Sequence, residues 1–78
     1  MKFGAYPGHF PGDPIVPGAA LLEAVAAELG LRGVERLRFL AVVRPGEALE
    51  LRGGGTGPRV HFSVWRGEVE VARGIGRR

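Results

Sequence analysis

The sequence predicts an α+β fold in which a curved antiparallel sheet wraps around one central apolar helix. Two observations support this class: one segment is apolar around the whole circumference of a helix, and the segments after it alternate between apolar and polar residues. The 78 residues are expected to form a single domain, residues 1–78. Because so short a chain buries only about 60% of its unfolded surface and has no cysteine for disulfides, we expect oligomerisation to stabilise it.

The first part of the chain is expected to be largely irregular. Residues 2–6 are predicted to form a short strand and residues 7–18 a loop, because four prolines and three glycines occupy those twelve positions. No basic segment precedes an apolar stretch at the start, and no apolar stretch is long enough to span a bilayer. A soluble, cytoplasmic protein is therefore expected.

The helix is predicted over residues 18–29. Pro17 suits its first position, where the missing N–H is not needed, and Gly30 is a natural C-cap. Within residues 19–27 every residue except Glu23 is apolar. A helix that is apolar all round is expected to be buried on all sides.

Four strands are predicted after the helix, joined as an antiparallel meander with one apolar face. The positions predicted to face inward are Leu37, Phe39, Ala41, Val43, Leu49, Leu51, Val60, Phe62, Val64, Val69 and Val71. Reversals are predicted at residues 44–47, 53–58 and 66–67, where glycine or proline occurs.

One helix enclosed by one curved sheet is the hot-dog arrangement. A sheet with so few strands is too small to cover the helix alone, and it leaves its edge strands unpaired. A second subunit would extend the sheet and cover the helix. The fold and the formation of a homodimer, or of a larger assembly of dimers, are thus predicted by the same argument.

The net charge of +3 and the pI near 10.6 would suit a protein that binds nucleic acid. The basic residues are scattered, however, and aromatic residues are not interleaved with them in a recognisable RNA-binding motif. A solvated surface with a basic tail explains the charge better, and attraction of an acidic protein partner is the next interpretation. The absence of Asn and Gln is typical of thermophiles, although a GC-rich genome would also favour arginine, glycine and alanine.

Glu23 is the one charged residue within the apolar stretch of the predicted helix. A buried carboxylate is costly unless it is paired, hydrogen-bonded or protonated. Apolar surroundings would favour the neutral form, which is a usable general acid near neutral pH. A glutamate that reaches a gap in the sheet or bonds a backbone N–H fits the pattern equally well, so the residues alone leave both interpretations open.

Two further groups would complete an elimination site with this acid. His9 lies in the proline-rich loop, where proline restricts the chain as the placement of a catalytic base requires, although a lone histidine is more often a turn residue. At the helix start no Ser, Thr, Asp or Asn caps the first turn. The N–H of Gly18 and its neighbours would then hold either water or a carbonyl oxygen that gains negative charge.

Other motifs are weaker. The glycine run in residues 53–57 precedes no Lys-Ser/Thr pair and opens no helix, so it is not a phosphate-binding loop. Asp13 fits a turn, and His61 fits the exposed side of a strand. With His9 and His61 as the only imidazoles and no cysteine, a metal site is not expected.

Residues 8–24, GHFPGDPIVPGAALLEA, closely resemble the GHFPGxPxxPGxxxxE signature of the β-hydroxyacyl-acyl carrier protein dehydratases of fatty acid synthesis, which have the hot-dog fold. The spacing from His9 to Glu23 agrees with that signature. Residues 37–51 also resemble the F-x-x-x-V-x-P-G-D-x-L-x-L stretch of the family. Members are longer chains, and the part without a counterpart here precedes the histidine, so the chain is expected to be shortened at its N-terminus.

The resemblance implies a reaction and residues for it. His9 would take a proton from the carbon next to the thioester, and Glu23 would help the 3-hydroxyl leave as water, giving a trans-2-enoyl thioester. Gly18 would polarise the thioester through its N–H, and Gly8 and Phe10 would join it in binding substrate. The substrate would ride on acyl carrier protein or coenzyme A. The histidine of one subunit would meet the acid of the other, without any metal or redox cofactor.

Two alternatives to a dehydratase remain. A non-catalytic hot-dog subunit would bind acyl carrier protein or pair with a complete dehydratase. A hot-dog thioesterase would use Glu23 to activate water, although the intact loop around His9 argues against it. Turnover of a 3-hydroxyacyl thioester separates the enzyme from the subunit, and the product, enoyl thioester or free acid, separates the two enzymes.

Overall fold

Pro17 and Gly30 set the two ends of the helix. In the computed structural model, which describes residues 15–54 and 57–78, helix α1 runs over Gly18–Leu29. Pro17 is its N-cap and thus lies one position earlier than predicted. Gly30 adopts the left-handed conformation with φ 67°, and its N–H bonds the Ala26 carbonyl. The predicted helix is confirmed at both ends.

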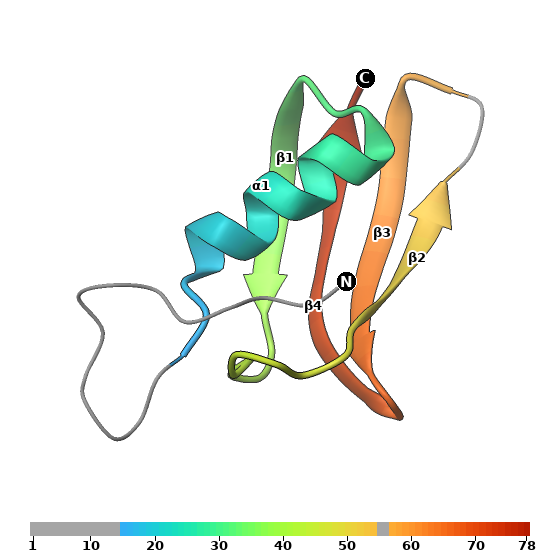
Figure 1. The fold of residues 1–78 in the computed structure, drawn as a ribbon. Coiled ribbons are helices and arrows are strands. Elements are labelled where there is room, and N and C mark those ends of the chain that lie inside the picture. The colour runs from blue at the N-terminus through green and yellow to red at the C-terminus, as the bar shows by residue number, and fades with distance from the viewer. Residues whose placement is uncertain (1–14, 55–56) are drawn as a thin grey trace.

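A four-stranded antiparallel sheet follows the helix (Figure 1). Its strands are β1 (Gly33–Phe39), β2 (Glu50–Gly54), β3 (Arg59–Arg66) and β4 (Val69–Arg77). The strand order is β1-β4-β3-β2, so β1 and β2 form the two edges. The predicted meander is wrong in this respect, because β1 pairs with β4 instead of β2.

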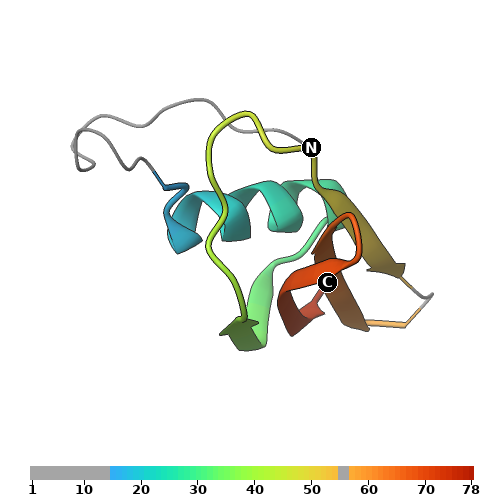
Figure 2. The same cartoon turned by 90° about the horizontal axis from the view of Figure 1, so that it is seen from below.

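The length of the connection between β1 and β2 explains why the observed strand order differs from the predicted one. A hairpin joins its strands through a loop of about two to five residues, whereas residues 40–49 form a longer segment. This segment crosses from one edge of the sheet to the other on the side of α1 (Figure 2). Alternation along a strand fixes the face that each residue takes, but it is compatible with more than one strand order.

Strand β2 extends further than predicted. Gly53 and Gly54, which were predicted to lie in a loop, pair with Phe62 and His61 of β3. A Cβ at Gly53 would lie 2.5 Å from the His61 carbonyl oxygen, so glycine is needed for this close approach of the strands. The short strand predicted at residues 2–6 lies outside the described residues.

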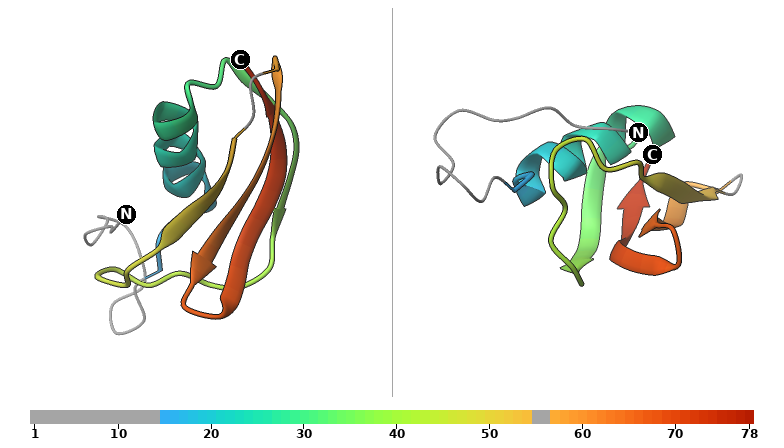
Figure 3. Two further views of the ribbon diagram at one scale, coloured as in Figure 1. Left: turned by 90° about the vertical axis from the view of Figure 1, so that its right-hand side faces the viewer. Right: turned by 60° about the horizontal axis from the view of Figure 1, so that its bottom comes forward.

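Helix α1 lies against the concave face of the sheet (Figure 3), and the apolar core lies between the two. The buried side chains are Val16, Leu21, Val25, Val43, Leu49, Val60, Phe62, Val64, Val71 and Ala72. Phe39 and Val69, which were also expected to face inward, lie at strand ends and remain 49% and 46% exposed. One helix on a curved antiparallel sheet is the predicted α+β hot-dog class.

Among the described residues, the sheet covers α1 on one side only. Leu21 and Val25 are buried, whereas Ala19, Glu23 and Ala27 are exposed. The expectation that the helix is buried all round is therefore wrong for one chain, because the four strands lie against a single side of it. Within the described residues, no helix combines the length and hydropathy needed to cross a membrane.

The other face of the sheet is polar and charged. His61 is exposed, in agreement with its assignment to the surface. Trp65 donates from Nε1 to Ser63 Oγ at 2.8 Å, and the Arg52 guanidinium lies 4.4 Å from the centroid of its ring. The guanidinium thus lies over one face of the indole, and Trp65 is partly buried.

Candidate active site

The first turn of α1 has no side-chain cap, as predicted. Pro17 is extended, with φ −61° and ψ 143°, and its carbonyl oxygen accepts from the N–H groups of Ala20 and Leu21 at 3.0 and 3.2 Å. No backbone carbonyl among the described residues accepts from the N–H of Gly18. The helix start thus combines an N–H group with the positive end of the helix dipole, which suits an oxygen that carries negative charge.

Gly18 lies in close contact with Phe39 at the end of β1. A Cβ added at Gly18 would lie only 2.6 Å from Phe39 Cζ. Glycine permits this close approach of an aromatic ring, because a larger side chain would have to displace the outer end of the ring. The position of the helix start therefore depends on β1.

Val16, two positions earlier, is held by the connection between β1 and β2. Its N–H donates to the Val43 carbonyl oxygen at 2.7 Å. Both side chains are buried, at 7% and 4% exposure. The chain entering α1 is thus fixed by a hydrogen bond and by packing in the core.

Glu23 lies on the uncovered side of α1. At about 1.5 Å per residue it is about 8 Å along the axis from Gly18, and helical side chains lean back toward the N-terminus. Its side chain is exposed in the single chain, contrary to the burial that the sequence predicts. No basic side chain among the described residues forms an ion pair with it.

Glu23 lines a shallow, mainly apolar recess between α1 and the start of β1. The lining residues are Ala19, Leu22, Glu23, Ala26, Leu31, Arg32, Gly33 and Val34. The recess thus places an acidic residue beside apolar surface. His9, the predicted base, and its neighbours Gly8 and Phe10 lie outside the described residues, so their roles stay predictions.

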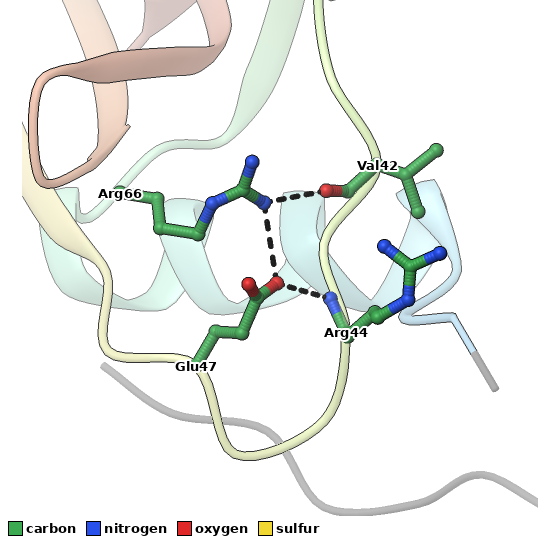
Figure 4. A network of polar contacts seen from close by, with 4 residues as sticks. All are labelled: Val42, Arg44, Glu47 and Arg66. Atoms are coloured by element: carbon green, nitrogen blue, oxygen red, sulfur yellow. Dashed lines mark hydrogen bonds and ion pairs between the residues drawn. The ribbon is translucent and has the colours of Figure 1, made fainter. Parts of the chain in front are cut away.

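The connection between β1 and β2 contains an ion pair that was not predicted from the sequence. The turn predicted at residues 44–47 is confirmed by the bond from Glu47 N–H to the Arg44 carbonyl at 3.3 Å. The Glu47 carboxylate also accepts from the Arg44 N–H and lies 3.2 Å from Arg66 Nη1 (Figure 4). This ion pair was not predicted because its partners are 19 positions apart in the sequence. They come together only because the connection between β1 and β2 crosses the sheet.

The backbone bond from Arg44 has the largest effect on the Glu47 carboxylate. Together with the charge of Arg66, it holds the pKa of Glu47 below its ordinary value, against the opposing effect of desolvation. The carboxylate is therefore ionised, and bonded to both partners, throughout the neutral pH range.

The fold and this site define a class of proteins: hot-dog proteins with an acidic residue on the central helix. The family model of ApeI dehydratases matches residues 2–75, and the chain belongs to this ApeI-like family.

The chain is also similar to curated dehydratases named 3-hydroxyacyl-acyl-carrier-protein dehydratase FabZ. The relative from Syntrophomonas wolfei is 31% identical over 81 positions, which cover 85% of this chain and 56% of the relative. The relative from Protochlamydia amoebophila is 37% identical over 80 positions, covering 85% and 49%. That from Chloroflexus aggregans is 43% identical over 61 positions, covering 59% and 42%. The chain spans about half the length of the curated relatives it matches. No solved structure matches it significantly.

Proposed function

We propose that the chain dehydrates 3-hydroxyacyl thioesters to trans-2-enoyl thioesters, in fatty acid or related acyl-chain synthesis. The observation that carries this proposal is the position of Glu23, which lines an apolar recess on the uncovered side of α1, about one and a half turns after an uncapped helix start. Family membership supports it. The names of the relatives support acyl carrier protein as the carrier of the substrate.

The proposed reaction assigns one task to each group. His9 removes a proton from the carbon next to the thioester carbonyl, and Glu23 donates a proton to the 3-hydroxyl, which leaves as water. The electron pair of the broken C–H bond forms the new double bond. The thioester oxygen gains negative charge meanwhile, and the N–H of Gly18 stabilises that charge. Gly8 and Phe10, beside the base, bind substrate.

The two protons balance, because one leaves the carbon and one joins the departing hydroxyl. No electrons are gained or lost, so the elimination needs no redox cofactor, and the acid makes a metal unnecessary for the leaving group.

The proposal includes a homodimer in which His9 of one subunit meets Glu23 of the other. It is supported by the uncovered side of α1, where Leu22 and Ala26 line the recess. Strands β1 and β2 are also edges of the described sheet, and Val42, in the connection that follows β1, is 50% exposed. A partner that covered both features would bury apolar surface and pair open edges. A stable folded monomer in sedimentation equilibrium at micromolar concentration would exclude this dimer.

Mass spectrometry of a 3-hydroxyacyl-carrier protein incubated with the purified chain tests the reaction. Loss of water is the expected result. Release of free acid would indicate a thioesterase, and an unchanged substrate would leave the non-catalytic subunit as the better account. We also propose that residues 1–78 form one domain, which limited proteolysis would test. We further propose a cytoplasmic location, which cell fractionation would test.

Complementation tests the shared site. The single variants His9→Ala and Glu23→Gln are expected to be inactive. Mixing them under conditions of subunit exchange should restore part of the activity, because some mixed dimers regain one complete site. No recovery in a mixture shown to exchange subunits would contradict a site shared between chains.

A further inference from the structure

The connection between β1 and β2 is held on both sides of one buried residue, Val43, which is 4% exposed. The carbonyl oxygen of Val42, just before it, accepts a hydrogen bond from Arg66 Nη1 at 2.7 Å. The N–H of Arg44, just after it, donates to Glu47 Oε1. Arg66 and Glu47 are joined to each other at 3.2 Å, so they form one clamp around the segment (Figure 4).

Val43 in turn holds the entry to α1. Its carbonyl oxygen accepts the N–H of Val16 at 2.7 Å. Pro17 follows Val16, and the proline ring fixes φ at that residue. Little conformational freedom remains between Val16 and Gly18, so a displacement of Val43 would move the first N–H groups of the helix.

This clamp differs from an ordinary surface ion pair. Arg52 and Glu50, both in β2, form such a surface pair, and their side chains are 48% and 64% exposed. Arg66 and Glu47 are 31% and 28% exposed, and they also bond two backbone groups of the crossing connection. Partial shielding from water strengthens charged hydrogen bonds. The clamp therefore fixes a backbone segment instead of only neutralising charge.

We propose that Arg66 and Glu47 are positioning residues for the N–H groups at the start of α1, acting through Val43 and Val16. The clamp keeps the N–H of Gly18 aimed at the place where the thioester oxygen gains negative charge. The inference rests on the proposed dehydratase function, because that reaction supplies the oxygen for this N–H to bind.

A donor that stabilises charge in the transition state acts mainly on kcat, and its effect depends on its placement. Removing the clamp is therefore expected to lower kcat with little change in KM. A general loss of stability would instead reduce the fraction of folded protein and leave kcat per folded molecule unchanged.

Three variants test the clamp. Arg66→Met removes the guanidinium but keeps an unbranched stem, and Arg66→Lys keeps the charge. Arg73→Met is the matched control, because Arg73 pairs with Glu70 away from α1. The first measurement is amide hydrogen exchange, which requires no activity. Exchange at Val16 should be roughly tenfold faster in Arg66→Met, partly restored in Arg66→Lys and unchanged in the control, as expected for loss of one charged hydrogen bond.

The second measurement is kcat and KM for a 3-hydroxyacyl thioester carried on acyl carrier protein. A roughly tenfold lower kcat at similar KM is expected for Arg66→Met, with partial recovery in Arg66→Lys. If the wild type is active and Arg66→Met has the same kcat, the inference is wrong but the proposed function stands. Equal acceleration of exchange at Val16 and at core residues such as Val64 would overturn it too. An inactive wild type would overturn the proposed function itself, so the two failures are distinguishable.

Discussion

The two sides of α1 are made of similar residues and have different surroundings. Leu21 and Val25 are 4% and 1% exposed against the sheet. On the other side, Ala19 and Glu23 are exposed, and Leu22 is only partly buried. Apolar surface that a small domain leaves open marks a site for a partner or a ligand. The covered side therefore holds the fold together, whereas the open side carries the residues that we connect with association and catalysis.

The largest effect is expected for the carboxylate on the open side. Glu23→Gln keeps the size and hydrogen-bonding capacity of the side chain but cannot donate the acid proton. Dehydration should fall by about 10² to 10⁴-fold, the usual contribution of a general acid. Mass spectrometry of a 3-hydroxyacyl-carrier protein measures this loss of activity, and a thermal melt shows whether the variant is still folded.

Glu28→Gln is the matched control for this variant. Glu28 is also exposed on α1, but it does not line the recess. Its activity should stay near that of the wild type. If Glu23→Gln kept wild-type activity, or if both variants lost it equally, the open side would not contain the acid.

A second pair of variants compares packing on the two sides. Leu21→Ala removes a side chain from the core and should cost about 2–5 kcal/mol in the free energy of unfolding. Leu22→Ala lies on the recess side, so its cost should depend on protein concentration, as expected when a side chain contributes to association. Urea unfolding at several protein concentrations measures both. A concentration-independent loss of the same size in Leu22→Ala would remove the distinction between the sides.

A third prediction concerns the start of the helix, where both sides meet β1. Gly18→Ala places a Cβ against the Phe39 ring and should cost about 1–3 kcal/mol, as overpacking usually does. Phe39 is 49% exposed, so Phe39→Ala alone should cost less than a core truncation.

The double variant, Gly18→Ala with Phe39→Ala, should be more stable than the sum of the two single losses implies. A thermal melt of the four proteins measures this coupling, and additive effects would mean that the ring does not constrain Gly18.

Local features of this fold were predictable from the sequence. Pro17 and Gly30 mark the helix ends because each favours a conformation found there. Alternation identified the inward side chains of β3, with Val60, Phe62 and Val64 all buried. Hydrophobic period and capping act within a few residues, so a single sequence contains their full signal.

Long-range features were not predictable in the same way. The order of β1 and β2 depends on the path of residues 40–49, which alternation does not specify. Glu23 was expected to be buried, since periodicity reports that a helix is apolar all round but not how much of it one chain covers. The Glu47–Arg66 pair required the tertiary path of the crossing connection.

The smallest effect on stability is expected at the Glu47–Arg66 ion pair, which holds the connection between β1 and β2, and it should depend on pH. The Arg44 N–H and the Arg66 charge lower the pKa of Glu47 in the folded protein. A group with a lowered folded pKa contributes stability that is complete above its unfolded pKa, about 4.3 for glutamate, and is lost as pH falls through the folded pKa. Glu47→Gln should therefore be less stable than the wild type at neutral pH, and the difference should shrink as the pH falls below about 4. Thermal melts of both proteins across this range measure the difference.

Glu50→Gln is the control, because it breaks a pair between exposed side chains. It should show little loss of stability at neutral pH. A difference between wild type and Glu47→Gln that persists undiminished in acid would mean that the carboxylate acts through its shape, and that its charge does not hold the connection.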